Sequence, residues 1–259
     1  MNFGICDLSV IPLRAEPSDK SEMVSQLLFG EVFEVLENSN NKWLRVHTIS
    51  DDYTGWLDEK QVQLIAHAAF KEMSTGPAVS LPGEIALAES KFRDIQLLPG
   101  SSLPLPDGNF FTMNGERFKF IGISSTAVGE NTIELIPEFA LHFLDAPYLW
   151  GGRSIFGIDC SGLTNVVFKM AGIHLRRDAW QQSEQGILVS FIDEARPGDL
   201  AFFNNEEGKI IHTGIILEHK KIIHASGRVR IDTLDHYGIF NEEQKRYTHQ
   251  LRLIKRMIG

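Results

Sequence analysis

The hydrophobic pattern of this chain changes near residue 132. Before that point, short apolar runs alternate with turn residues, as at 32–37 and 43–48. After it, apolar residues first recur at helical spacing, over 133–144, 163–171 and 179–185, and strand-like runs then follow to residue 254. Closely spaced short strands predict small β-barrels. Helices followed by antiparallel strands predict an α+β domain.

The barrel-like part is expected to contain two similar units. Residues 1–65 carry a Leu-Arg pair, a Gly-Glu turn, Trp-x-x-Val and Gly-Trp in that order, and they resemble a bacterial SH3-like domain. Residues 66–78 are predicted as a connector. Residues 79–128 repeat the pattern more faintly and predict a second, degenerate SH3-like barrel. Residues 129–259 then form the α+β domain.

Charge and composition exclude several classes of partner. The net charge is −9, from 25 basic and 34 acidic residues, which argues against nucleic acid or an anionic membrane as a partner. The N-terminus lacks the basic and apolar regions of a secretory signal, and no run approaches the ~20 apolar residues of a membrane span. A cytoplasmic location is therefore expected.

Cysteine and histidine usage bounds the chemistry. The two cysteines, Cys6 and Cys160, are too few for a disulfide framework, and Cys6 lies in an apolar run that predicts a buried packing residue. Neither Cys-x-x-Cys nor His-Glu-x-x-His occurs, so the sequence predicts no metal and no organic cofactor.

One cysteine and two histidines form a candidate catalytic group. Cys160 lies at the expected start of a helix, where unpaired N–H groups and a partial positive charge favour the thiolate of a nucleophile. His212 and His224 fall on two strand-like runs joined by a turn at 218–220, so neighbouring antiparallel strands can bring their rings together. His212 would be the base, and His224 would fix its tautomer. The remaining histidines are predicted to lie at the surface, and they include His219, His236 and His249.

These segments resemble the NlpC-type cell-wall peptidases. The resemblance rests on Gly-Ile-Asp-Cys-Ser-Gly-Leu at 157–163, Arg-Pro-Gly-Asp-Leu at 196–200, His-Thr-Gly-Ile at 212–215 and Ile-His-Ala-Ser at 223–226. Over about residues 132–259 it implies a papain-like fold and a Cys-His-His triad of Cys160, His212 and His224. Together with two SH3-like units, it implies a γ-D-glutamyl-L-diamino-acid endopeptidase that acts on free muropeptides.

The resemblance also implies substrate-binding residues. Tyr148 and Trp150 match the family's Pro-Tyr-x-Trp-Gly-Gly segment, and Tyr148 could donate to an oxyanion, although both residues could instead be core. Asp178 is a helix N-cap with Gln181 three residues on, and the subgroup that requires a free amino terminus also has Asp there. Its carboxylate could pair with the substrate ammonium while it caps the helix.

Four further residues complete the predicted substrate site. Asp159 and Ser161 flank Cys160 and would line the same pocket, although Ser161 could equally be an ordinary first-turn residue. Tyr53 and Glu22 are the candidates from the first SH3-like unit to reach the substrate. Ordinary barrel surface is the alternative for both.

The sequence therefore predicts a thiol hydrolase of cell-wall turnover peptides. It would cut the bond between γ-D-Glu and an L-diamino acid, either L-Lys or meso-diaminopimelate, and release L-Ala-γ-D-Glu. An amidase or acyltransferase with the same triad is one alternative, and Asp178 discriminates because those substrates offer no ammonium. A non-catalytic wall-binding protein is the other, and the intact triad argues against it. The identity of the diamino acid and the oligomeric state stay open.

Overall fold

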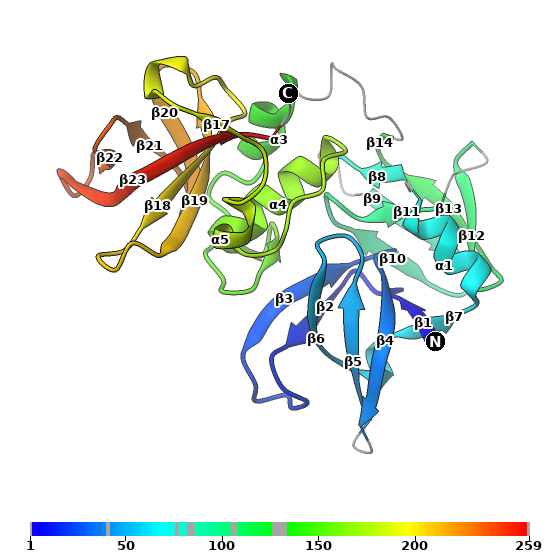
Figure 1. The fold of residues 1–259 in the computed structure, drawn as a ribbon. Helices are drawn as coiled ribbons and strands as arrows, with labels where there is room; N and C mark the ends of the chain where they lie inside the picture. Colours follow the sequence, from blue (N-terminus) through cyan, green and yellow to red (C-terminus); the bar gives the residue numbers. More distant parts are fainter. Residues whose placement is uncertain are drawn as a thin grey trace. The chain divides into compact units, whose positions relative to one another are not determined.

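The computed structural model describes residues 2–39, 42–75, 78–81, 86–104, 108–125 and 134–257. The chain divides into two compact units. The first comprises Met1–Ala127 with Gly151–Arg153, and the second comprises Val128–Trp150 with Ser154–Gly259 (Figure 1). Each unit is described by itself. Among the described residues, no helix is long and apolar enough to cross a bilayer.

The first unit begins with a seven-stranded antiparallel sheet, in the order β3-β2-β6-β5-β4-β1-β7. Its strands are β1 (Asn2–Ile5), β2 (Val10–Arg14), β3 (Met23–Leu28), β4 (Val32–Ser39), β5 (Trp43–Thr48), β6 (Tyr53–Asp58) and β7 (Gln63–Ile65), with a 3-10 turn η1 (Glu59–Gln61) between the last two. Alternate residues point inward, among them Ile11, Leu13 and Leu27. Cys6 is fully buried in the same core, which confirms its prediction as a packing residue.

The predicted connector contains a packed helix, α1 (His67–Ser74). Phe70 on this helix stacks on Phe3 with ring centroids 4.2 Å apart, and Met73 is buried in the same cluster. The remaining strands of the unit form a four-stranded sheet, β10-β9-β13-β12, and a three-stranded sheet, β11-β8-β14. Their bounds are β8 (Ala78–Ser80), β9 (Ala86–Ser90), β10 (Asp94–Leu97), β11 (Ser102–Leu103), β12 (Phe110–Met113), β13 (Glu116–Ile121) and β14 (Ser124–Ser125).

One hydrophobic cluster joins these parts of the first unit. It contains Ile5 and Phe29 from the N-terminal sheet together with Ala88 and Phe118 from the second. The predicted boundaries at 65 and 79 therefore run through a shared core, and the division of this unit into two barrels and a connector stays a prediction.

A short segment of the predicted α+β domain belongs to the first unit. It is Gly151–Arg153. Both nitrogens of the Arg153 guanidinium contact the Glu31 carboxylate, at 2.7 and 2.9 Å, and both side chains are 1% exposed. Removing one partner of such a buried pair leaves an uncompensated charge, so each residue depends on the other.

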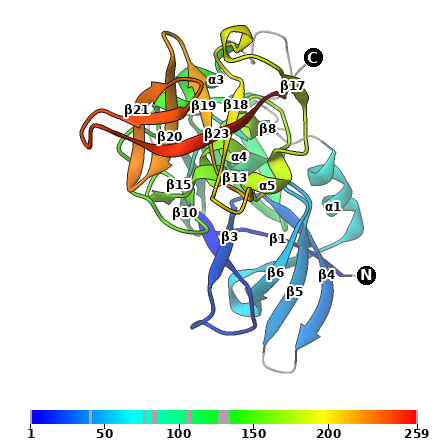
Figure 2. The same ribbon diagram turned by 60° about the vertical axis from the view of Figure 1, so that its left-hand side comes forward.

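The second unit is built on a seven-stranded antiparallel sheet, in the order β17-β23-β18-β19-β20-β21-β22, and β22 also pairs with β23. Helices α3, α4 and α5 pack against β19, as both ribbon views show (Figures 1 and 2). The strands are β17 (Ile187–Val189), β18 (Leu200–Asn204), β19 (Ile210–Leu217), β20 (Lys221–Ser226), β21 (Arg228–Leu234), β22 (Gly238–Asn241) and β23 (Arg246–Arg256). The other elements are α3 (Ile136–Leu141), β15 (Arg153–Ser154), β16 (Gly157–Ile158), α4 (Cys160–Met170), α5 (Ala179–Gln182) and η2 (Ile192–Glu194).

Helix α4 is the central helix of this unit. The Asp159 carboxylate caps its N-terminus by accepting from the Gly162 N–H at 2.6 Å. All of its residues are buried, and the helix ends before Gly172, which takes a positive φ of 78°. The three predicted helices are thus present, although residue 133, the predicted start of the first, lies outside the described residues.

Candidate active site

The Cys160 sulfur lies where the start of α4 meets strand β19. It accepts hydrogen bonds from the backbone N–H groups of Ser161 and Thr213, and Thr213 directly follows His212. Burial, followed by the charge of Asp159, raises the pKa of the Cys160 thiol to about 12, although Arg177 and the two N–H groups act in the opposite direction. The N–H group at the start of the helix thus favours the thiolate, as predicted, but burial outweighs it in the protein without substrate.

The two predicted histidines meet as the sequence indicated. His212 on β19 and His224 on β20 are both buried, and Nε2 of the first lies 2.9 Å from Nδ1 of the second. Their strands are joined by a tight turn in which His219 and Lys220 both take positive φ values. Burial lowers the pKa of both imidazoles, and His224 and His249 lower that of His212 further. The base is therefore neutral at the start of a reaction.

His249 does not lie at the surface, so that prediction is wrong. Its ring on β23 stacks on the ring of His212, with centroids 4.1 Å apart and planes 22° apart, and Phe203 contacts both rings. Strand β23 pairs with β18, which places His249 beside the catalytic strand. Burial lowers the pKa of His249 to about 4. A neutral, stacked ring is suited to hold the plane of the base.

The same three histidines are the candidate metal ligands in the described chain. One ring nitrogen from each of His212, His224 and His249 lies within 4.8 Å of the others. Because the rings of His212 and His249 are stacked, their in-plane lone pairs lie in two nearly parallel planes, which does not favour convergence on one ion. The hydrogen bond between His212 and His224 uses two of the nitrogens. The arrangement fits proton transfer better than metal binding.

The structure places Tyr148 beside the nucleophile and leaves Trp150 exposed. The backbone of Tyr148 forms an isolated β-bridge with Ile158, just before α4, and the Tyr148 N–H donates to the Gly227 carbonyl at 3.0 Å. Burial raises the pKa of Tyr148 to about 12, together with the negative charge that Cys160 carries once it loses its proton and the charge of Asp159. Its hydroxyl therefore keeps its proton and can donate. Trp150 is 61% exposed, so the core alternative is wrong for this residue.

Asp159 and Ser161 are fixed by a buried arginine. The Arg177 guanidinium contacts both Asp159 oxygens, at 3.0 and 2.6 Å, and donates to the Ser161 hydroxyl at 2.9 Å. One Asp159 oxygen also caps α4. These contacts tie both neighbours of Cys160 to one cation. They support a structural role for Asp159 beside the predicted substrate contact.

Asp178 follows this arginine directly. It is the N-cap of α5 and forms a capping box with Gln181, whose Oε1 accepts from the Asp178 N–H at 3.0 Å. Because Arg177 binds both neighbours of Cys160, the adjacent Asp178 backbone is held close to the start of α4. The predicted cap is confirmed, and the predicted contact with a substrate ammonium stays a prediction.

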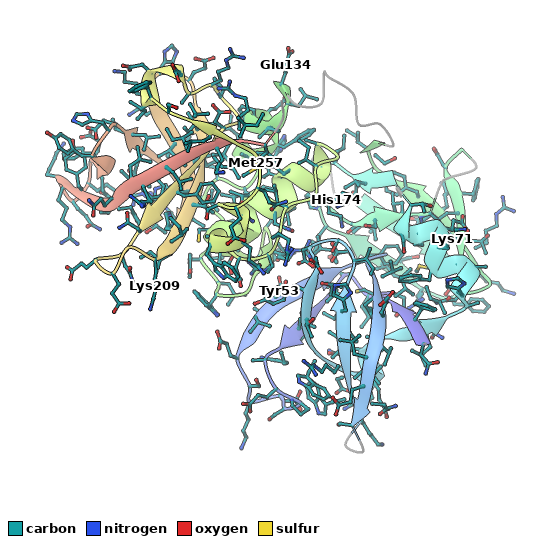
Figure 3. All side chains as sticks on the ribbon, viewed as in Figure 1. Tyr53, Lys71, Glu134, His174, Lys209 and Met257 are labelled. Carbon is teal, nitrogen blue, oxygen red and sulfur yellow. The ribbon has the colours of Figure 1, made fainter. Side chains whose placement is uncertain are left out.

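The candidates from the SH3-like unit lie on its sheet and turns. Tyr53 begins β6 and packs partly against the barrel core (Figure 3). Glu22 is exposed just before β3. Their predicted contact with substrate stays a prediction.

Comparison with known proteins identifies the family. Residues 145–252 match the NlpC/P60 family, and residues 13–62 match the bacterial dipeptidyl-peptidase Sh3 domain. A gamma-D-glutamyl-L-lysine dipeptidyl-peptidase of Bacillus subtilis is 32% identical over 78% of this chain and 71% of its own. The chain belongs to the NlpC/P60 family.

Two further comparisons cover most of this NlpC/P60 peptidase. Dipeptidyl-peptidase 6 of Lysinibacillus sphaericus is 27% identical over 86% of this chain and 88% of its own. A crystal structure of an NlpC/P60 family protein from Bacillus cereus aligns over 99% of this chain and 100% of its own, with a TM-score of 0.82 at 20% identity. The predicted order of folds, SH3-like β domains followed by a papain-like α+β catalytic domain, is confirmed, as is the prediction of an enzyme.

Sequence reasoning about this NlpC/P60 enzyme missed three residues near the triad. They are His249, Arg177 and Asp232, the last of which contacts His224 at 3.1 Å. The sequence did contain an indication for His249. Residues 247, 249, 251 and 253 share one face of a predicted strand, and the leucines at 251 and 253 indicate that this face is turned inward. The Arg-x-Asp spacing at 230 and 232 likewise places both side chains on one face.

Proposed function

We propose that this chain is a cysteine dipeptidyl-peptidase that cuts the γ-D-glutamyl–L-diamino-acid bond of murein peptides. The products are L-Ala-γ-D-Glu and a remainder that begins with the diamino acid. The observation that carries the proposal is that the Cys160 thiol, at the start of α4, accepts from the N–H of Thr213, the residue next to His212, and that His212 is hydrogen-bonded to His224. The names of the relatives favour L-Lys as the diamino acid.

The reaction follows from the protonation states of the triad. As the sulfur of Cys160 bonds to the γ-glutamyl carbonyl carbon, its proton passes to His212, and the C=O electron pair forms an oxyanion. The C–N bond then breaks, and the leaving amine takes the proton from His212, which leaves a thioester. Water attacks the thioester with His212 as base, and the acid and the free thiol are released. The raised pKa of the thiol and the lowered pKa of His212 favour a neutral thiol and a neutral imidazole as the starting forms.

Tyr148 is suited to stabilise the oxyanion. Its hydroxyl stays protonated because burial, the charge of a Cys160 thiolate where one forms, and the charge of Asp159 raise its pKa to about 12. Tyr148→Phe removes the donor and keeps the ring. If Tyr148 donates to the oxyanion, kcat should fall about 100-fold with little change in KM. An unchanged kcat would remove Tyr148 from the mechanism.

Asp178 provides the proposed selection for a free amino terminus. A carboxylate on the α5 cap, next to the Arg177 anchor, can pair with the ammonium of the substrate's L-Ala. Blocking the amino terminus removes the positive charge of the ammonium and places an acyl group beside the carboxylate. Substrates with a blocked amino terminus should therefore be poor. An amidase or acyltransferase with the same triad would show no such discrimination.

The deciding experiment uses synthetic L-Ala-γ-D-Glu-L-Lys and its meso-diaminopimelate analogue, with products read by mass spectrometry. The wild-type enzyme should release L-Ala-γ-D-Glu, and N-acetylation of the alanine should lower kcat/KM at least about 100-fold. Cys160→Ala should abolish turnover while the fold survives. Release of a different product, or activity above about one hundredth in the Cys160 variant, would overturn the assignment.

The role of Asp178 is separated from helix capping by Asp178→Asn, which keeps a capping oxygen. The variant should lose most activity on the free peptide and discriminate less against the acetylated one. Asp58→Asn is the matched control, because Asp58 caps η1 in the first unit through the Lys60 N–H at 3.0 Å. Equal rates on blocked and free peptides would leave Asp178 as a cap only.

A role in the recycling of cell-wall peptides in the cytoplasm is part of the same proposal. The expected preference for small peptides with a free amino terminus supports it. Fractionation of cells that express the full-length protein, followed by detection of the L-Ala-γ-D-Glu-releasing activity, tests the location. Activity confined to the culture medium would contradict it.

A further inference from the structure

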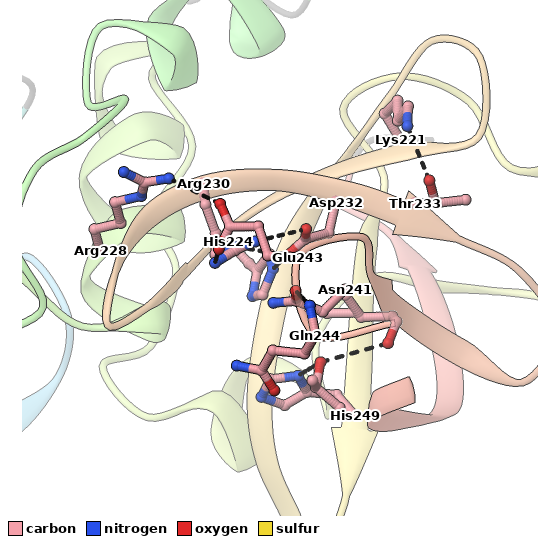
Figure 4. Close-up of polar contacts among 12 residues, drawn as sticks. Lys221, His224, Arg228, Arg230, Asp232, Thr233, Asn241, Glu243, Gln244 and His249 are labelled. Carbon is pink, nitrogen blue, oxygen red and sulfur yellow. Dashed lines mark hydrogen bonds and ion pairs between the residues drawn. The ribbon is translucent and has the colours of Figure 1, made fainter. Parts of the chain in front are cut away.

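Asp232 is a buried carboxylate that contacts the triad but is not part of it. It lies on β21 and is 3% exposed. Its Oδ2 lies 3.1 Å from Nε2 of His224, the nitrogen that does not face His212 (Figure 4). A buried carboxylate needs a compensating charge or several hydrogen bonds, and this one has both.

Arg230 keeps Asp232 ionised. Its Nε and Nη2 donate to the two Asp232 oxygens at 2.7 and 3.0 Å, and its Nη1 donates to Glu243 at 3.1 Å (Figure 4). Burial raises the pKa of Asp232, but the hydrogen bonds from His224 and Arg230 outweigh it and leave the pKa below its ordinary value. An ionised carboxylate can only accept hydrogen bonds. The contact with His224 therefore requires a proton on Nε2 of that ring.

The proton on Nε2 of His224 determines the tautomers of both His224 and His212. A neutral His224 with its proton on Nε2 presents an unprotonated Nδ1, which accepts from Nε2–H of His212 at 2.9 Å. The remaining nitrogen of His212, Nδ1, is then unprotonated and can take the thiol proton. In the opposite tautomer of His224, Nδ1 would donate, and His212 would have to carry its own proton on Nδ1.

We propose that Asp232, held by Arg230, is a positioning residue that fixes the tautomer of His224 and thereby keeps Nδ1 of His212 available as the base. The chain of contacts runs Arg230–Asp232–His224–His212. When His212 takes the thiol proton, it becomes an imidazolium, and the negative charge of Asp232 lies one ring away. Asp232 touches neither substrate nor sulfur in this scheme. The inference rests on His212 acting as the base of the proposed peptidase.

Asp232→Asn tests the inference, because the amide keeps the size of the carboxylate. Arg230 donates to both Asp232 oxygens, so it does not determine which end of the amide faces His224. The amide also lacks the negative charge, and it can face His224 with a donor or with an acceptor, so the tautomer of that ring is no longer fixed. We expect kcat/KM to fall about 100-fold with little change in KM. Asp145→Asn is the matched control. Asp145 pairs at 3.3 Å with Arg228, which lies on the same strand as Asp232, but the Asp145 side chain is exposed. It should change kcat/KM less than about twofold.

A double-mutant cycle separates positioning from general stability. If Asp232 acts through His224, Asp232→Asn should cost less than about threefold in a His224→Ala background. The same loss in both backgrounds would show an independent role and overturn the proposal. So would unchanged kcat/KM for Asp232→Asn in the otherwise wild-type enzyme.

The ring tautomers provide a readout that does not depend on any substrate. Nitrogen NMR of the histidine side chains should show protonated Nε2 on both His212 and His224 at neutral pH. In Asp232→Asn, at least part of the His224 population should carry its proton on Nδ1. Unchanged tautomers in a folded variant would overturn the inference even if activity falls. If the wild-type enzyme does not cut the proposed peptides, that result refutes the substrate and leaves this measurement valid.

Discussion

Nε2 of His212 lies 2.9 Å from Nδ1 of His224, and the two rings stand nearly perpendicular, at 87°. The residues come from adjacent antiparallel strands, in which Ile215 pairs with Ile223. That register makes the two histidines diagonal neighbours, which long side chains can bridge. The base is thus held by the sheet, and its geometry depends on the backbone of β19 and β20.

The two histidines should differ in their effect on turnover. His212→Ala removes the proton acceptor and should lower kcat nearly as much as loss of Cys160, about 1,000-fold or more. His224→Ala should lower it less, about 10–100-fold, because water can partly replace an orienting group. Steady-state kinetics on the tripeptide measures both. Wild-type kcat/KM in His224→Ala would show that the third member of the triad lies elsewhere.

Gly214 provides a test that leaves every catalytic side chain in place. A Cβ at this position would lie 2.9 Å from the Cβ of His224 and 2.9 Å from the Ile223 carbonyl oxygen. Gly214→Ala should therefore push β20 away and lengthen the contact between the histidines. We expect kcat to fall at least about tenfold and the free energy of unfolding to fall by about 1–3 kcal/mol.

The control for this substitution is Gly208→Asn. Gly208 lies in the turn before β19 with nothing within 4 Å of its position for a Cβ, and asparagine tolerates its positive φ of 80°. Its kcat should stay at the wild-type value. Wild-type kcat in Gly214→Ala would mean that the histidine pair tolerates a shift of the strand.

The contact between the two histidines of the candidate triad could be predicted from sequence, because each candidate residue has a local signature. Helical spacing located α4, and the 12-residue separation across a hairpin turn located His212 and His224. Their contact follows from the register of one short hairpin, so few alternatives exist. The SH3-like sheet was likewise visible in strand and turn patterns.

The surroundings of the triad could not be predicted, because they depend on contacts between distant segments. His249 reaches His212 only because β23 pairs with β18, with a register shift between Phe202 and Phe203. Asp232 reaches His224 only because β21 pairs with β20 in the register that sets Asp232 opposite Ile222. The helix N-terminus suggested a low thiol pKa for Cys160, whereas burial, which no local pattern reveals, raises it.

The protonation state of Cys160 predicts how its alkylation depends on pH. Because its pKa is raised to about 12, the thiolate fraction should grow about tenfold per pH unit across neutral and mildly alkaline pH. The rate of iodoacetamide modification, followed by mass spectrometry of the Cys160 peptide, should rise steadily from pH 6 to pH 9.5. A plateau below pH 8 would instead show a thiolate–imidazolium pair in the free enzyme.

Cys6 serves as an internal control for that measurement. It is fully buried in the first unit, and its Sγ–H donates to the Leu8 carbonyl at 3.2 Å. The peptide that contains Cys6 should stay unmodified while the protein is folded. Modification of Cys6 at a given pH would show that the protein unfolds there, and the Cys160 rate measured at that pH would be left out of the comparison.

The half-buried His249 ring leads us to expect that the protein loses stability in mild acid. Burial lowers its pKa to about 4, below the ordinary value of about 6.5 in an unfolded chain. Between these values only the unfolded state takes up the proton, so the contribution of His249 to stability is complete above pH 6.5 and is lost as the pH falls toward 4.

His249→Phe keeps the stack on His212 and removes the titration of this ring. Between pH 7 and pH 4.5 the wild-type protein should lose about 2 kcal/mol more free energy of unfolding than the variant. Calorimetry of both proteins at the two pH values measures this difference, and the many other titrating groups cancel in the comparison. Equal losses in the two proteins would show that His249 is protonated in the folded state and that its stack on His212 does not exclude the charge.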